Sequence, residues 1–159
     1  TEELFQYTLA VSDTEKLMLE TINLNGILES CISSYYVALK QNDIIPEIKI
    51  PDQKIFRLAN EHALTRVLGN MISNAIKYSD GDMKITLSEN GKITFSNTAY
   101  RLDEIQVGRL FDRFYTVETA RKSTGLGLAI SKTLIEKMNG TISAEYKNSR
   151  LSIHIFLSE

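Results

Sequence analysis

The sequence predicts a two-layer α/β sandwich, in which a mixed, mostly antiparallel sheet is covered by helices on one face. Two observations lead to this fold class. Apolar residues recur at three- and four-residue steps in some segments and alternate with polar residues in others, and the two kinds of segment follow each other in blocks. The chain has 159 residues and shows no internal repeat, which suits one domain whose core needs no disulfide.

Five segments are predicted to be helical from the spacing of their apolar residues and from signals at their ends. The first contains no Gly or Pro. Asn60 is a good N-cap for the third, because its side chain can accept a hydrogen bond from the first turn. The last ends at Asn139-Gly140, since both residues tolerate the left-handed conformation that closes a helix. These helices span residues 1–19, 24–39, 62–78, 102–114 and 125–138.

Six segments are predicted to be strands, and four of them pair as hairpins. Asn90-Gly91 is a typical hairpin turn, and residues 147–149 connect the last two strands. Pro51-Asp52 separates the first two strands, because Pro and Asp favour turns. The strands span residues 44–50, 54–58, 83–87, 92–95, 141–146 and 150–157, and residues 20–24 form a short extended crossing.

The composition excludes several classes of protein. With 18 Lys and Arg residues against 20 Asp and Glu residues, the net charge is -2, so no nucleic-acid partner is expected. Cys31 is the single cysteine, which excludes an internal disulfide and suits a reducing, cytoplasmic setting. No apolar run approaches the roughly 20 residues of a membrane span, so we expect no membrane contact by this chain. Because it opens on Thr1 rather than Met, we expect a piece of a longer protein.

The third predicted helix carries an unusual polar stripe. Asn70 and Asn74 are four residues apart and share one face, and Lys77 follows one turn later beside Tyr78. Asn is unfavourable inside a helix because its side chain competes for the backbone. An amide oxygen suits Mg²⁺, and an ammonium group suits a phosphate. The stripe forms either a ligand site or a pair of amides that hydrogen-bond neighbouring loops, and this segment alone leaves the two interpretations even.

Two other segments each allow a functional and a purely structural interpretation. Residues 123–130 form a polar loop with a Gly-x-Gly that runs into an apolar helix, where exposed N–H groups favour anions. Leu128 stands where a Walker A loop would continue towards Gly-Lys, so phosphate binding competes with simple packing of the helix end. Residues 110–115 carry aromatic side chains three residues apart, which are either core residues or anchors for the loop over 116–123.

Taken together and in this order, the three segments resemble the motifs of the ATP-binding catalytic domain of bacterial sensor histidine kinases. That domain belongs to a wider family shared with gyrase, Hsp90 and MutL. The resemblance covers residues 23–156 and makes residues 1–20 similar to the end of a dimerisation hairpin, with residues 21–159 as the ATP-binding domain. The matching motifs are the N box (Asn70–Ser79), the F box (Leu110–Tyr115) and the second glycine box (Thr124–Leu128).

The resemblance implies ATP and Mg²⁺ as cofactors and gives each matching residue a role. Asn74 would coordinate the Mg²⁺ that bridges the ATP phosphates, and Asn70 would be a second polar contact near them. Lys77 would reach a phosphate, and Tyr78 would pack on the adenine. Residues 116–123 would be the lid that closes over ATP, hinged by the F box. The other implied nucleotide contacts are Asn97, Thr124, Gly125, Leu126, Gly127 and Leu128.

Two departures from the family pattern have consequences for the chemistry. Hydrolytic relatives carry a glutamate base four residues before the metal asparagine, whereas this chain has Asn70 there, which favours phosphoryl transfer over hydrolysis. The first glycine box is also altered. Asn97 takes the position of its aspartate, and Ala99 and Arg101 take the positions of its glycines, which narrows the pocket beside the base. The neutral amide oxygen of Asn97 would accept the hydrogen bond from the adenine amino group, in place of a charged carboxylate.

The implied function is that of a protein-histidine kinase in two-component signalling. No His-Glu/Asp-x-x-Thr-Pro stretch is present, so we expect the phosphoacceptor histidine on a dimerisation domain outside this chain and read His62 and His154 as structural or surface residues. The other implied partner is a cognate response regulator, and the setting is the cytoplasmic part of a membrane-anchored sensor. Two alternatives stay open: a degenerate module that binds a protein partner, and a serine kinase of the anti-sigma type, which Asn70 disfavours.

Overall fold

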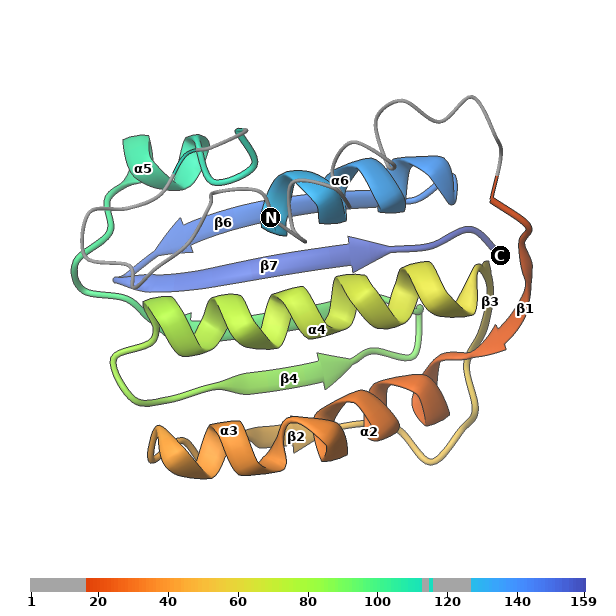
Figure 1. Ribbon diagram of the computed structural model, residues 1–159, viewed down its shortest axis with the longest axis horizontal. Helices are drawn as coiled ribbons and strands as arrows, with labels where there is room; N and C mark the ends of the chain where they lie inside the picture. Colours follow the sequence, from red (N-terminus) through yellow and green to blue (C-terminus); the bar gives the residue numbers. More distant parts are fainter. Residues whose placement is uncertain (1–16, 113–114, 116–126) are drawn as a thin grey trace.

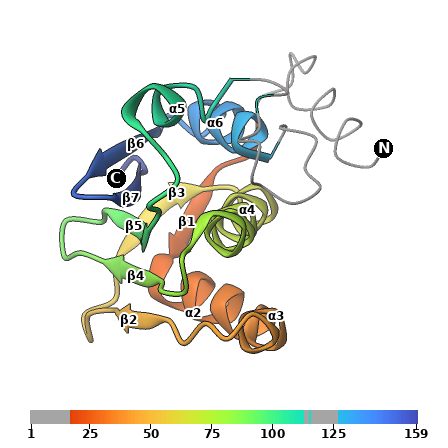
Figure 2. The ribbon, with the colours of Figure 1, turned by 90° about the vertical axis from the view of Figure 1, so that its left-hand side faces the viewer.

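The computed structural model describes residues 17–112, 115 and 127–159, which form two layers. A five-stranded sheet makes one layer, and helices pack against one of its faces (Figures 1 and 2). The predicted fold class is therefore confirmed. Most of the helix predicted over residues 1–19, and the whole loop predicted over 116–123, lie outside the described residues.

The large sheet is mixed and mostly antiparallel, with the strand order β2-β4-β5-β7-β6. Only β2 and β4 run parallel, and the other neighbours are antiparallel. A second sheet of two antiparallel strands, β1 and β3, lies beside the first (Figure 1). The strands are β1 (Glu20–Asn23), β2 (Glu47–Lys49), β3 (Phe56–Ala59), β4 (Lys84–Leu87), β5 (Ile93–Thr98), β6 (Thr141–Lys147) and β7 (Arg150–Phe156).

The helical layer is centred on α4, the longest helix, which packs against α2, α6 and β5. Its buried side chains recur at helical spacing, because one stripe of the helix faces the sheet while the other face meets solvent. At its start the Asn60 side chain accepts a 3.0 Å hydrogen bond from the Ala63 N–H, as predicted. The helices are α2 (Leu24–Ser34), α3 (Tyr36–Gln41), α4 (Glu61–Tyr78), α5 (Glu104–Gly108) and α6 (Gly127–Lys137).

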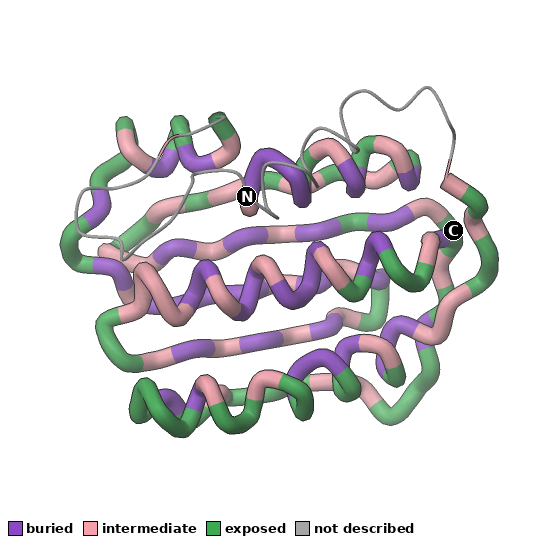
Figure 3. The backbone as a smooth tube through the Cα atoms, in the orientation of Figure 1, coloured by how far each residue is buried: buried purple, intermediate pink, exposed green. Residues whose placement is uncertain are grey.

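The core lies between the two layers, and the strands alternate accordingly. In Figure 3, buried and less buried residues follow each other along β4 and β7. On β5, Ile93 and Phe95 face the helices and are buried, whereas Thr94 and Thr98 are only half-buried. The outer face of the sheet is therefore polar, and it carries the side-chain networks described below.

The helix predicted over residues 24–39 is two helices, and this is the main error in the helix predictions. The chain turns at Tyr35, between α2 and α3. The hydroxyl of Ser34 donates to the Cys31 carbonyl at 2.7 Å and so competes with the helical hydrogen bonds. Tyr35 also packs on α4 at Gly69, where an added Cβ would lie 2.7 Å from the Tyr35 hydroxyl. This contact across the helical layer fixes the break.

The strand predictions need two further corrections. Residues 20–23, predicted as an extended crossing, form β1 and pair with β3, so the first two predicted strands belong to different sheets. The strand predicted over 44–50 is only three residues long, because Pro46 precedes it and Pro51 closes the segment behind it. The helix predicted over 102–114 shortens to α5, which begins at an Asp103 capping box.

Candidate functional site

The polar stripe of α4 lies at the carboxyl half of the helix. Asn74 is only 7% exposed, and among the described residues its side-chain amide has no hydrogen-bond partner. Its amide atoms are not among the fully buried polar atoms that lack a partner, so they keep contact with solvent and a ligand can reach them. Lys77 and Tyr78 are half-buried at the end of the helix. Asn74 is thus an amide of the stripe whose oxygen is available to a ligand.

Asn70, the other asparagine of the stripe, is held by α6. Its Nδ2 donates to the Gly127 carbonyl and to the Ser131 hydroxyl, both at 3.1 Å. Gly127 is the first residue of α6, so this amide ties the middle of α4 to the start of the helix that follows the glycine segment. For Asn70, the structure thus shows a contact between elements, with Oδ1 left as an acceptor.

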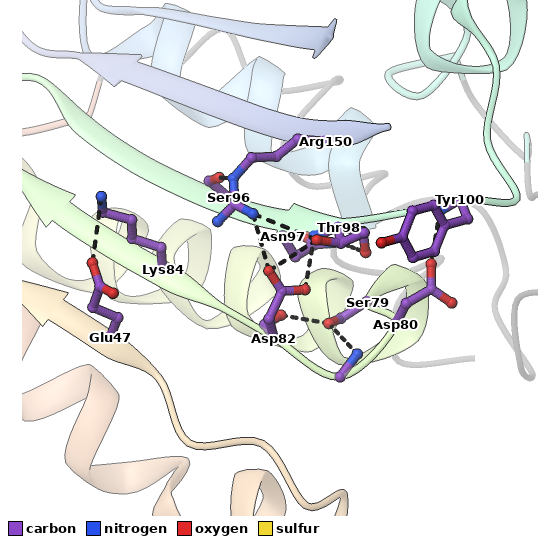
Figure 4. A network of polar contacts seen from close by, with 11 residues as sticks. Glu47, Ser79, Asp80, Asp82, Lys84, Ser96, Asn97, Thr98, Tyr100 and Arg150 are labelled. Carbon is purple, nitrogen blue, oxygen red and sulfur yellow. Dashed lines mark hydrogen bonds and ion pairs between the residues drawn. The ribbon is translucent and has the colours of Figure 1, made fainter. Parts of the chain in front are cut away.

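Asn97 lies near the end of β5, on the face that meets the helices. It is 2% exposed, and its Nδ2 donates to the Thr98 carbonyl at 3.0 Å. Because a carbonyl can only accept, this bond assigns the amide nitrogen and leaves Oδ1 as the free acceptor. Figure 4 shows Asn97 beside Thr98, above the turn that follows α4.

The end of α4 and the altered glycine box enclose a small cavity. Its volume is about 50 Å³, which is room for a few water molecules and far less than the roughly 300–1,000 Å³ of a typical ligand pocket. The structure therefore brings the N box and the altered first glycine box together, with little space between them. The lining residues are Lys77, Tyr78, Ser79, Asp80, Ala99, Arg101 and Leu102.

A tyrosine that the sequence analysis did not single out braces this segment. The Tyr146 hydroxyl, on β6, contacts the carbonyl oxygens of Ala99 at 2.7 Å and of Leu102 at 2.8 Å. The Asp80 carboxylate accepts a 2.7 Å hydrogen bond from the Tyr100 N–H on the other side. Residues 99–102 are thus fixed by β6 and by the turn after α4, and only the fold brings these distant residues together.

A second network holds the end of β5 from the outer face of the sheet (Figure 4). The Asp82 carboxylate accepts from the Thr98 N–H at 2.8 Å and from the Arg150 Nη1 at 3.0 Å, and Arg150 Nε donates to the Ser96 hydroxyl at 2.6 Å. Burial raises the pKa of Asp82, but these hydrogen bonds and the Arg150 charge outweigh it and hold the pKa below its usual value. Asp82 is therefore ionised at neutral pH, and the network fixes the strand that carries Asn97.

The F-box segment packs between α5 and α6. Leu110 is buried, and Phe111 is partly buried with the Lys132 Nζ 6.0 Å from its ring centroid. The Arg109 guanidinium lies 4.5 Å from the Tyr115 ring centroid and pairs with Asp112 at 3.3 Å. Phe111 and Tyr115 thus serve partly as core side chains, which agrees with the first of the two interpretations of this motif.

The second glycine box is described only in part. Gly127 begins α6, and Leu128 is buried in the core, so its backbone alone is available to a ligand. Thr124, Gly125 and Leu126 lie outside the described residues.

The two histidines lie elsewhere on the fold. His62 is exposed in the first turn of α4, at the opposite end of the helix from Lys77. His154 lies on the outer face of β7, where Nδ1 is 2.9 Å from the Thr94 hydroxyl and Nε2 is 3.4 Å from Glu145. These surface contacts fit the structural interpretation of both residues. Among the described residues, no group of three or more His, Cys, Asp or Glu side chains could hold a metal ion.

The fold and this arrangement of motifs are those of a nucleotide-binding domain, and comparison with known proteins identifies its family. Residues 59–159 match the family described as histidine kinase-, DNA gyrase B-, and HSP90-like ATPase. The match covers more than half of the chain, which therefore belongs to this family. Of the described residues, none lies in a helix long and apolar enough to cross a membrane.

Several of the similar proteins are sensor histidine kinases. The chain is 36% identical to the sensor histidine kinase YcbM of Bacillus subtilis, over 86% of this chain and 47% of that protein. It is 31% identical to the sensor protein kinase WalK of Staphylococcus epidermidis, over 89% of this chain and 25% of that protein. The full-length structure of ShkA in complex with AMPPNP superimposes with a TM-score of 0.82 at 20% identity, over 99% of this chain and 35% of that one. The chain thus spans half or less of the length of these proteins.

Proposed function

We propose that this chain is the ATP-binding kinase domain of a sensor histidine kinase and that it transfers the γ-phosphoryl group of ATP to a histidine on a dimerisation domain outside the chain. One observation carries the proposal: Asn70 and Asn74 share one face of α4, and Asn70 Nδ2 donates at 3.1 Å to the carbonyl of Gly127, the first residue of α6. The match to YcbM and the AMPPNP held by ShkA support it.

The residues of the α4 stripe fit a magnesium ion with its nucleotide. Mg²⁺ prefers oxygen ligands and keeps part of its water shell, so one amide oxygen beside the phosphate oxygens is enough protein ligation. Asn74 would supply that oxygen, and Mg²⁺ would neutralise charge that develops on the phosphates. Lys77 would contact a phosphate as a point charge. The backbone N–H groups of the second glycine box, Thr124–Leu128, would donate to the phosphate oxygens.

The residue at position 70 favours transfer of the phosphoryl group to a side chain over hydrolysis. A P–O bond between the γ-phosphorus and the β,γ-bridging oxygen breaks, an N–P bond to the imidazole forms, and ADP leaves with the electron pair. Asn70 stands where hydrolytic relatives have a glutamate, and an amide cannot accept the proton of an attacking water. The chain's contribution is therefore to position ATP against the acceptor imidazole.

The base would lie at the end of β5, with Tyr78 against the ring. The Nδ2 of Asn97 is used on the Thr98 carbonyl, so Oδ1 would accept from the 6-amino group of adenine, where guanine carries a carbonyl oxygen.

The proposal extends to the domain boundaries, the partners and the setting of the whole sensor protein. We assign residues 1–20 to the end of the dimerisation hairpin and residues 21–159 to the kinase domain. The partners would be the dimerisation domain that carries the phosphoacceptor histidine and a cognate response regulator that receives the phosphoryl group. The domain would work in the cytoplasm as part of a membrane-anchored sensor.

Calorimetric titration of ATP with and without Mg²⁺ tests the proposal. We expect Mg²⁺ to strengthen ATP binding, and Asn74→Ala to abolish that gain while Ser73→Ala, one residue earlier on the same helix, retains it. If Asn74→Ala retains both the ATP affinity and the Mg²⁺ gain, the assignment of the metal ligand is wrong.

The altered first glycine box, with Asn97, Ala99 and Arg101 at its positions, favours one other candidate function, a degenerate module that binds a protein partner. A domain whose pocket stays closed would gain no stability from nucleotide, because a ligand stabilises only the state that binds it. A melting temperature that does not rise with millimolar Mg-ADP would therefore support the degenerate module, and a rise would support the kinase domain.

A further inference from the structure

Ser131 is a buried hydroxyl on an otherwise apolar face of α6. It is 0% exposed, and its neighbours Ile130 and Leu134 belong to the core. A buried hydroxyl is tolerated only when its hydrogen bonds are satisfied, and here both partners lie at the contact between α6 and α4. The Ser131 hydroxyl donates to the Gly127 carbonyl at 3.0 Å and accepts from the Asn70 Nδ2 at 3.1 Å.

These contacts leave one orientation for the Asn70 amide. The Gly127 carbonyl can only accept, so the group that faces it at 3.1 Å is the amide nitrogen. The Ser131 proton is used on the same carbonyl, so the hydroxyl offers a lone pair to the second proton of Nδ2. A rotation of the amide by 180° would place Oδ1 against the Gly127 oxygen and would lose both bonds.

We propose that Ser131 is a positioning residue that fixes the Asn70 amide with its oxygen toward the nucleotide, on the helix face that it shares with Asn74. This inference rests on the proposed function, because it gives Oδ1 of Asn70 a ligand among the phosphates, the metal and its water. Ser131 touches none of these groups. It acts through Asn70 and through Gly127, the first residue of the helix whose start would face the phosphates.

The substitution Ser131→Ala removes the hydroxyl and keeps a good helix former. One of the two bonds that orient Asn70 is lost, and one hydrogen bond corresponds to roughly a 2- to 10-fold change in an equilibrium. We therefore expect the gain in ATP affinity that Mg²⁺ produces to fall by about 2- to 10-fold, while the affinity without Mg²⁺ changes less.

The same helix offers a matched control. The Thr133 hydroxyl donates to the Ala129 carbonyl at 3.1 Å, which is the same bond to the fourth preceding residue, and none of its hydrogen bonds within the described residues reaches α4. The variant Thr133→Ala therefore reports the effect of losing such a bond within α6. The double variant of Asn70→Ala with Ser131→Ala should be no weaker than Asn70→Ala alone, because Ser131 acts through Asn70.

The experiment combines a structural and a binding readout. In the nucleotide-free protein, NMR follows the exchange with solvent of the Asn70 side-chain amide protons, which we expect to be protected in the wild type and in Thr133→Ala but to exchange faster in Ser131→Ala. Calorimetry then compares ATP binding with and without Mg²⁺ in the same proteins. Loss of the Mg²⁺ gain in Ser131→Ala alone supports the proposal.

Two results would overturn it, and they are distinguishable. If the wild type shows the Mg²⁺ gain and Ser131→Ala matches Thr133→Ala in both readouts, Ser131 has no positioning role although the proposed function stands. If the wild type itself shows no Mg²⁺ gain, the proposed function fails and the role of Ser131 fails with it.

Discussion

Asn97→Asp places a carboxylate where the sensor-kinase resemblance expects one, yet the structure predicts that it destabilises this chain. The side chain is 2% exposed, and its Nδ2 donates to the Thr98 carbonyl at 3.0 Å. A carboxylate cannot donate that bond and sets a negative charge against the carbonyl oxygen. The Thr98 carbonyl still accepts from the Asp80 N–H at 2.9 Å, so the cost comes from losing the Asn97 bond and from burying a charge beside that oxygen, about 1–3 kcal/mol of unfolding free energy at pH 8.

The cost should depend on pH in a defined direction. Burial without a donor raises the pKa of the introduced carboxyl in the folded state above its unfolded value of about 4. The protonated form can donate to the Thr98 carbonyl, so the loss relative to wild type is small at low pH and grows as pH rises through the folded pKa.

Urea denaturation of both proteins at pH 5 and pH 8 measures this difference. Asn148→Asp serves as the control, since Asn148 is exposed in the turn between β6 and β7. A difference at pH 8 below about 0.5 kcal/mol, within the range of ordinary surface substitutions, would refute the reasoning.

Three other predictions follow from the described contacts. Tyr146→Phe removes the one proton that two carbonyl oxygens share and should cost about 1–2 kcal/mol in urea denaturation, so an unchanged midpoint would contradict the bracing role. Arg150→Met removes the charge that helps to hold the Asp82 pKa below its usual value. A depressed pKa gives stability that is lost as pH falls through it, so the variant should lose less unfolding free energy below pH 4. The control is Lys84→Met, which breaks a more exposed ion pair and should keep the steeper loss. Burial raises the pKa of the Cys31 thiol to about 11, so iodoacetamide at pH 8 should label it only on unfolding, and rapid labelling of the native protein would show an open site.

Local signals in the sequence predicted most of the fold. The Asn60 cap, the Asn90-Gly91 turn and the alternation along the later strands act within a few residues, so they are readable without the rest of the chain. The break at Tyr35 depends on its contact with Gly69, and the pairing of β1 with β3 joins segments more than 30 residues apart. Neither leaves a local pattern, so both required the fold.

The sequence likewise predicts one part of the candidate site and leaves the other part to the fold. The positions of Asn70, Asn74 and Lys77 on one stripe of α4 follow from helical spacing alone. Their partners do not, because Ser131 lies 61 residues from Asn70 in sequence. A serine within the apolar run of α6 was the signal that could have indicated a contact at the helix interface.

Transfer of phosphate in trans tests the central claim most directly. The chain is incubated with γ-labelled ATP and Mg²⁺ together with the separately produced dimerisation domain of its own sensor, which carries the phosphoacceptor histidine. We expect label on that domain in the acid-labile, base-stable form of phosphohistidine, and little release of inorganic phosphate. Steady release of inorganic phosphate with no label on the histidine would contradict it and would place the chain with the hydrolytic members of the family.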